Sequence, residues 1–175
     1  YSGEWGMELY IYRVLRSFLL LCAASCLIEC FGTGTARLVG LLKVNPQVWP
    51  GYHRELTVLF LALGYLTAAV EYGFAALVLY RGAGLLTELE RDPFGPACVE
   101  AAERVSRTCR SGLSIICLTG LMLNVAQILL TPLLQNISVT VTVPVAGLAV
   151  CFAMLAVTKL LVRGKELKDD NDLFV

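Results

Sequence analysis

The sequence has a single histidine, His53, and little charge of either sign. Only 16% of its residues are Asp, Glu, Lys or Arg, whereas a soluble domain carries about 25%. One histidine excludes a haem held by two histidines of this chain, and it leaves a histidine-based catalytic pair without its second member. The 14 basic and 14 acidic residues cancel, so the net charge gives no reason to expect direct nucleic-acid binding.

The seven cysteines include no Cys-x-x-Cys pair, the spacing that marks many zinc and redox sites. Cys22, Cys26 and Cys30 form one helical stripe, but its ends are about 12 Å apart along the axis, too far for one metal ion. We interpret the cysteines as free thiols that pack as small apolar side chains, and we expect no metal or other cofactor. A membrane thiol redox protein is the least favoured alternative.

The segments with little charge are long apolar runs. The chain of 175 residues is 57% apolar, and its apolar residues fall into four blocks. About 20 apolar residues at a rise of about 1.5 Å each cover the hydrocarbon core of a bilayer. We therefore predict one membrane domain, residues 1–175, with an all-α fold: a four-helix transmembrane bundle with spans at about 10–31, 56–80, 111–131 and 137–161. Small residues are expected to permit close helix crossings; they are Gly64, Ala68, Gly112, Gly120 and Ala126.

Residues 81–110 form a connector of mixed charge between the second and third spans. Within it, Val99, Ala102, Val105 and Cys109 recur at helical spacing with charges between them. Pro96 suits the first position of a helix, where its missing N–H is not needed. We predict a short amphipathic cytoplasmic helix over 97–110 that leads into the third span.

The third and fourth spans are separated by a very short segment, residues 132–136, which predicts a tight antiparallel hairpin. The fourth span opens with the β-branched run 139–143, which alone suggests a strand. The length and the Ala/Leu-rich second half of the span favour a helix instead, with a kink at Pro144.

Orientation follows from the distribution of Lys and Arg between the two sides of the membrane. The N-terminal segment, the charged connector and the C-terminal tail share one side, with eleven of these residues: Arg13, Arg16, Arg81, Arg91, Arg104, Arg107, Arg110, Lys159, Arg163, Lys165 and Lys168. The other side has three: Arg37, Lys43 and Arg54. We predict an integral plasma (inner) membrane protein with both termini in the cytoplasm.

Glu71 is the one charge well inside the second span. An intramembrane acid usually faces the bundle interior and often marks a ligand or ion pathway. Tyr65, Asn124 and Gln127 are candidate neighbours, because the last two lie three residues apart and share a helix face. One interpretation is a ligand-binding site of these four residues, and the other is a structural hydrogen bond from Glu71 to a neighbouring helix.

The predicted amphipathic helix carries a second candidate site, a charged surface for docking a partner. Its residues are Glu100, Glu103, Arg104, Arg107 and Arg110. Such a face can also lie on the membrane, contact the acidic tail, or be only solvated.

Several short motifs resemble a bacterial family of small four-span inner-membrane proteins that carry a domain of unknown function. They are the Pro93-Phe94 step, the basic run from Glu103 to Arg110, and the Leu-rich acidic ending from Glu166 to Val175. The chain differs from the family pattern after Pro93-Phe94 and at Phe174. The resemblance implies no established activity, but members are often encoded beside a Cro-type helix-turn-helix repressor, which implies a regulatory partner.

We therefore expect a non-enzymatic membrane protein that acts as a regulator or accessory subunit through its cytoplasmic connector and tail. The alternative is a small-molecule sensor or carrier that uses Glu71. The expected partners are membrane lipid and a cytoplasmic or membrane protein, and the sequence does not decide between a monomer and a homo-oligomer.

Overall fold

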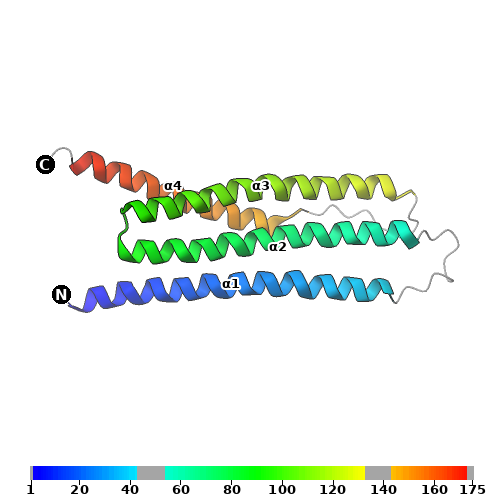
Figure 1. The fold of residues 1–175 in the computed structure, drawn as a ribbon, viewed down its shortest axis with the longest axis horizontal. Coiled ribbons are helices and arrows are strands. Elements are labelled where there is room, and N and C mark those ends of the chain that lie inside the picture. Colours follow the sequence, from blue (N-terminus) through cyan, green and yellow to red (C-terminus); the bar gives the residue numbers. More distant parts are fainter. Residues whose placement is uncertain (1, 43–53, 133–142, 173–175) are drawn as a thin grey trace.

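The computed structural model describes residues 2–42, 54–132 and 143–172. In these ranges the chain forms four α-helices and no strand: α1 (Ser2–Leu42), α2 (Arg54–Arg91), α3 (Pro96–Leu130) and α4 (Val145–Asp172) (Figure 1). All four are long and apolar enough to cross a membrane. The predicted all-α fold with four membrane-spanning helices is confirmed.

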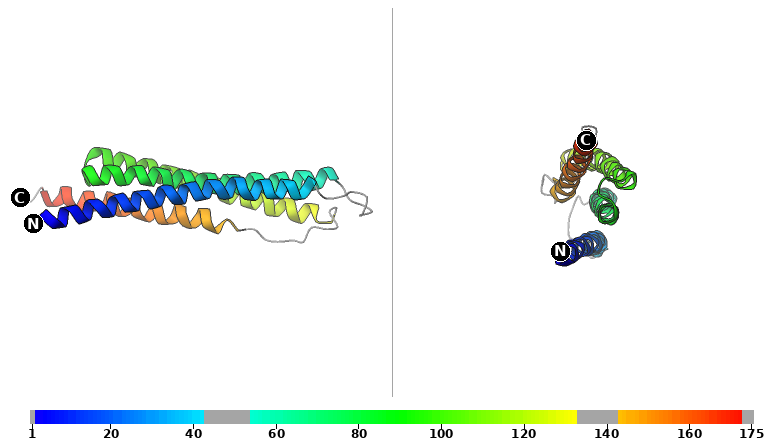
Figure 2. Two further views of the ribbon diagram at one scale, coloured as in Figure 1. Left: turned by 90° about the horizontal axis from the view of Figure 1, so that it is seen from below. Right: turned by 90° about the vertical axis from the view of Figure 1, so that its left-hand side faces the viewer.

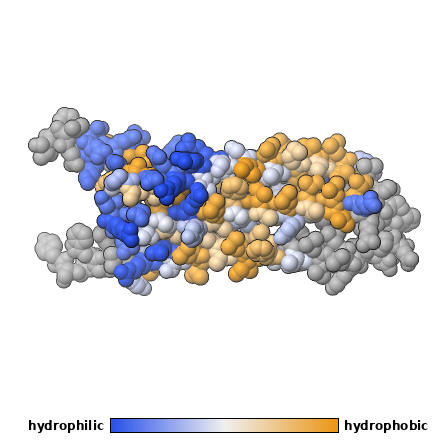
Figure 3. Space-filling model, viewed as in Figure 1, coloured by the Kyte–Doolittle hydropathy of each residue, from blue (hydrophilic) through white to orange (hydrophobic). Residues whose placement is uncertain are grey.

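The helices are longer than a bilayer requires. They contain 41, 38, 35 and 28 residues, which gives lengths of about 42 to about 62 Å against a hydrocarbon core of about 30 Å. Most hydrophilic residues on the visible face gather at the end where α1 begins, α4 ends and α2 turns into α3, and apolar residues predominate over much of the remaining length (Figure 3). We refer to this charged part as the polar end.

The helices do not surround one common axis. α2 packs against α1, α3 and α4, and α3 packs against α4. Viewed along the bundle, α1 lies on the far side of α2 from α3 and α4 (Figure 2). Ala23 of α1 packs on Ala76 and Leu79 of α2, with Cys22 and Cys26 beside them, so the cysteine stripe of α1 faces α2. The fold is a three-helix core with a fourth helix attached along α2.

The core between α2, α3 and α4 is built from small and β-branched side chains. Val78, Cys109, Ile116 and Cys151 are 0 to 1% exposed. A Cβ at Gly112 would lie 3.1 Å from the ring of Phe74, so this glycine lets α2 approach α3 closely. The expected close crossing is confirmed at Gly112. An added Cβ at Gly120 would be in ordinary contact with Pro144, just before α4, and one at Gly64 would have no neighbour within 4 Å among the residues whose side chains the structure describes.

The predicted connector of residues 81–110 is mostly helix. α2 continues to Arg91, α3 begins at Pro96, and only Asp92–Gly95 join them. Pro96 opens α3, as predicted, after Gly95 at the N-cap. The Asp92 carboxylate accepts a hydrogen bond from the Phe94 N–H at 3.3 Å. Residues 97–110 are therefore the first part of one continuous helix and not a separate element.

The predicted kink at Pro144 is wrong, because α4 begins after this residue. Val143 and Pro144 are not helical, and α4 runs from Val145 to Asp172. Residues 137–142 of the predicted span, and most of the predicted turn at 132–136, lie outside the described residues. Proline has no N–H and disfavours a helical residue before it, so a helix starts more readily after Pro144 than it passes through.

The start of α4 lies beside the middle part of α3. A Cβ at Gly120 would lie 3.5 Å from Cδ of Pro144, and α3 continues from Gly120 to Leu130. Ten residues of helix are about 15 Å. The N-terminus of α4 is therefore level with the apolar part of the bundle and not with its end.

Candidate functional site

Glu71 binds the N-terminus of α4. Its Oε1 accepts a hydrogen bond from the backbone N–H of Gly147 at 3.1 Å, and the side chain is half-buried. Gly147 is the third residue of α4, and the first N–H groups of a helix have no acceptor within it. A carboxylate also interacts favourably with the positive end of the helix dipole. Glu71 thus acts as an N-cap that a neighbouring helix supplies.

The absence of a side chain at Gly147 makes this contact feasible. A Cβ there would lie 2.8 Å from Cγ of Glu71 and 3.2 Å from Cδ1 of Ile116. Two other N–H groups of this turn have local acceptors: the Val145 N–H donates to the Val143 carbonyl at 2.8 Å, and the Leu148 N–H donates to the Pro144 carbonyl at 3.2 Å. The sequence contains the signal for this site, a proline followed by a helix with glycine in its first turn, but the partner of Glu71 was not predicted.

The structure does not bring the four predicted ligand-binding residues together. Glu71 is level with Ile116 of α3, because both lie beside Gly147. Asn124 and Gln127 follow Ile116 by about 12 and about 16 Å along the helix axis. Tyr65 precedes Glu71 by about 9 Å on α2, on a face turned by about 120°. Gln127 is buried, and Asn124 and Tyr65 are half-buried.

The five residues of the predicted docking surface lie together on the first part of α3. All are exposed: Glu100, Glu103, Arg104, Arg107 and Arg110. Arg104 donates to the Glu100 carboxylate at 2.5 Å, and Arg110 donates to the Ser106 hydroxyl at 3.3 Å. Within the described part of the chain, Glu103 and Arg107 form no ion pair, which leaves their charges available.

This surface belongs to the helical hairpin formed by the end of α2 and the start of α3. Leu85 of α2 and Cys98, Ala102 and Val105 of α3 are 1 to 3% exposed, and they continue the core cluster of Val78, Cys109 and Ile116 into the hairpin. Fully packed small side chains hold two helices in one arrangement. The charged face is therefore presented on a rigid support.

The other two helices dock on the same hairpin. Lys168 of α4 places its Nζ 5.1 Å from the centroid of the Phe94 ring, within the range of a cation–π interaction. A Cβ at Gly164 would lie 3.6 Å from the same ring. Arg13 of α1 lies 4.0 Å from the carboxylate of Glu90. The polar end is thus one assembly of all four helices.

A groove of about 870 Å³ runs between α3 and α4 at the polar end. Its charged lining is mixed, with three cations and two carboxylates: Arg110, Lys159, Arg163, Glu103 and Glu166. The wall also includes Leu155 and Val162. We call it the α3/α4 groove.

The cysteines form no disulfide. All seven are free: Cys22, Cys26, Cys30, Cys98, Cys109, Cys117 and Cys151. Cys109 of α3 and Cys151 of α4 are fully buried in the same core cluster. No group of three or more His, Cys, Asp or Glu residues that could hold a metal ion occurs where the structure describes the chain. His53 lies outside the described residues.

Comparison of the chain with models of protein families, with curated proteins and with solved structures gives no match. The resemblance to the bacterial four-span family therefore stays a prediction from the sequence motifs.

Proposed function

We propose that the protein is a non-enzymatic regulator or accessory subunit of the bacterial inner membrane. The N-terminus, the α2–α3 hairpin and the C-terminus would face the cytoplasm, where a partner protein docks on the hairpin and the last part of α4. The observation that carries this proposal is the pair of exposed charges at Glu103 and Arg107 on a rigidly packed hairpin.

Charge and rigidity both support this assignment. A preformed surface loses little conformational freedom on binding, so more of the contact energy appears as affinity. Charges without an internal partner set the orientation and the specificity of a complex. The hydrogen bond of Glu71 to Gly147 also gives the intramembrane acid a structural role, which leaves the hairpin as the stronger candidate for function.

The test is a quantitative purification in mild detergent from the native membrane, followed by mass spectrometry of the intact complex. We expect one partner protein at a fixed ratio to the wild-type chain. Arg107→Glu should lower the bound fraction by at least about tenfold, because a like charge placed against a complementary surface is repelled.

The matched control is Arg54→Glu. It is the same charge reversal, but it lies at the start of α2, at the opposite end of the bundle from the hairpin. It should leave the bound fraction unchanged. A wild-type chain that purifies alone, or equal losses in the two variants, would contradict the proposal.

A second candidate function is supported by a different observation. Glu71 is half-buried at a helix N-terminus that lies level with the apolar part of the bundle, and such sites can bind charged ligands inside membranes. A sensor or carrier of a small molecule would use Glu71, with Tyr65, Asn124 and Gln127 further along the bundle. In that case Glu71→Gln would abolish ligand binding without unfolding the protein.

A further inference from the structure

A second groove at the polar end lies between α1, α2 and α3. Its volume is about 440 Å³, and three arginines from three different helices line it: Arg16, Arg81 and Arg104. Glu88 is the only carboxylate in the lining that the structure describes. We call it the arginine groove.

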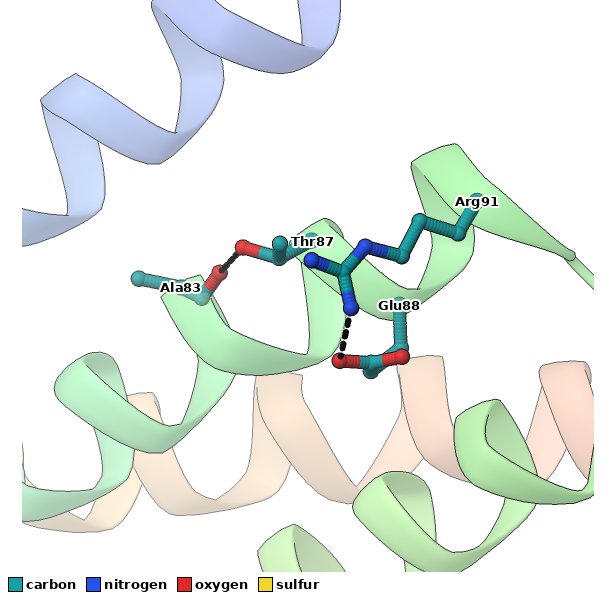
Figure 4. A network of polar contacts seen from close by, with 4 residues as sticks. All are labelled: Ala83, Thr87, Glu88 and Arg91. Atoms are coloured by element: carbon teal, nitrogen blue, oxygen red, sulfur yellow. Dashed lines mark hydrogen bonds and ion pairs between the residues drawn. The ribbon is translucent and has the colours of Figure 1, made fainter.

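The lone carboxylate does not neutralise these arginines. The Glu88 carboxylate pairs with Arg91, one turn further along α2, at 3.6 Å (Figure 4). Arg16 has no ion pair among the residues in ranges 2–42, 54–132 and 143–172. The groove therefore holds an excess of positive charge.

Arg81 is held in place without using up its charge. Its guanidinium donates to the Thr108 hydroxyl of α3, and Thr108 in turn donates to the Arg104 carbonyl at 2.8 Å. A guanidinium has five N–H donors, so most of those of Arg81 stay available. Arg104 shares its charge with Glu100 on the outer face of α3.

The groove lies where the charged surface meets the apolar one. Leu20 and Tyr80 also line it, and Tyr80 is 65% exposed. Towards the other end, α2 has no charge until Glu71, about 15 Å away along the helix axis. In a membrane, lipid headgroups would lie at this boundary, and acyl chains would lie along the apolar faces of α1 and α2.

We propose that the arginine groove binds a phosphate anion, supplied by the headgroup of an anionic phospholipid, with Arg16 and Arg81 as its main contacts. Guanidinium groups form paired hydrogen bonds with phosphate oxygens. Basic pockets between membrane helices on the cytoplasmic side are suited to anionic headgroups. A soluble phosphate ester offers the same chemistry, and the test distinguishes the two sources.

The α3/α4 groove provides the comparison. Its three cations face two carboxylates, which lowers the local excess of positive charge. It lies on the other side of α3 from α1, so a change there leaves the arginine groove intact.

The experiment titrates the delipidated full chain in detergent with dioleoylphosphatidylglycerol, dioleoylphosphatidylcholine or glycerol 3-phosphate. Binding is followed by intact-complex mass spectrometry, and thermal unfolding checks that each variant is folded. We expect the wild-type chain to bind phosphatidylglycerol at least about fivefold more tightly than phosphatidylcholine, since each nearby arginine contributes about a factor of five.

Arg16→Gln should weaken phosphatidylglycerol binding about fivefold, and Arg16→Gln with Arg81→Gln about 25-fold. Arg163→Gln, the same charge change in the α3/α4 groove, should leave the affinity unchanged. Glycerol 3-phosphate binding that depends on Arg16 at similar concentrations would keep the phosphate site and assign it to a soluble ester. Equal affinity for the two lipids, or equal losses in Arg16→Gln and Arg163→Gln, would overturn the proposal.

Discussion

The carboxylate of Glu71 on α2 accepts a hydrogen bond from the backbone N–H of Gly147 on α4 at 3.1 Å. This contact joins the acid in the middle of the second span to a helix N-terminus that would otherwise lack acceptors in an apolar environment. An unsatisfied N–H in the hydrocarbon region costs several kcal/mol. Glu71 therefore stabilises the start of α4, and its substitutions separate a structural role from a ligand-binding one.

Replacement of Glu71 should affect stability according to whether an acceptor remains. Glu71→Gln keeps a side-chain oxygen and is expected to lower the free energy of unfolding by less than about 1 kcal/mol. Glu71→Leu removes the acceptor and should cost about 2 kcal/mol. Thermal unfolding in detergent measures both changes. Glu55→Gln, at the exposed start of α2, is the control. Equal losses for Glu71→Gln and Glu71→Leu would show that the charge of Glu71, and not its capping hydrogen bond, stabilises the fold.

Gly147→Ala tests the same contact from the side of α4. The added Cβ would lie 2.8 Å from Cγ of Glu71, so the carboxylate or the helix has to move. We expect a loss of about 1 to 3 kcal/mol in the free energy of unfolding. Gly73→Ala is the matched control, because a Cβ there has no neighbour within 4 Å among the described residues and alanine stabilises a helix by up to about 1 kcal/mol relative to glycine. A neutral Gly147→Ala would mean that Glu71 and α4 are not in contact.

Hydrophobic length made the four helices predictable, because apolar runs of this size have few other structures open to them. The helix ends were harder. Residues 81–91 carry charge and were assigned to a connector, but they continue α2, and Leu85 and Leu89 pack against Cys98, Ala102 and Val105 of α3. Leu85, Leu86 and Leu89 recur at helical spacing, which was the local signal for this extension.

The residues of the candidate sites were recognisable in the sequence, but their spatial neighbours were not. Glu71 is conspicuous as the one charge well inside the second span. Its partner is a backbone N–H, and because almost every residue has one, the residue types did not identify it. The arginine groove forms because Arg16, Arg81 and Arg104, from three different helices, lie at the same height along the bundle. That level depends on how α1 is staggered against α2, and the sequence alone does not give the stagger.

Phe94 should hold the last turns of α4 against the hairpin. Phe94→Ala removes the ring under Lys168 and is expected to weaken this docking by about 0.5 to 1 kcal/mol. Amide hydrogen exchange over 164–172 should then be about two- to fivefold faster, by conversion of that energy. Phe152→Ala is the control, since Phe152 lies on α4 with the measured segment 164–172 and its ring is 62% exposed. Unchanged exchange in Phe94→Ala would show that the tail is held by other contacts.

The thiol redox alternative can be tested directly. Because all seven cysteines are free, membranes denatured under non-reducing conditions with an alkylating reagent should yield a chain carrying seven labels by mass spectrometry. In the folded protein, Cys109 and Cys151 should react far more slowly than Cys117, which is exposed. A chain with five labels in native membranes and seven after reduction would instead indicate a disulfide and favour a redox function.

The start of α1, the end of α4 and the α2–α3 hairpin lie at the same end of the bundle (Figure 1). All three therefore face the same side of the membrane. The excess of Lys and Arg at that end predicts that it faces the cytoplasm. Reporter enzymes active only in the periplasm should be silent when fused after Val175 or inserted between Asp92 and Gly95, and active when fused after Leu42. The reverse pattern would contradict the prediction. A cytoplasmic partner could then no longer reach Arg107, and the arginine groove would lie in the outer leaflet, so this measurement decides which lipids and which partners are relevant to the other tests.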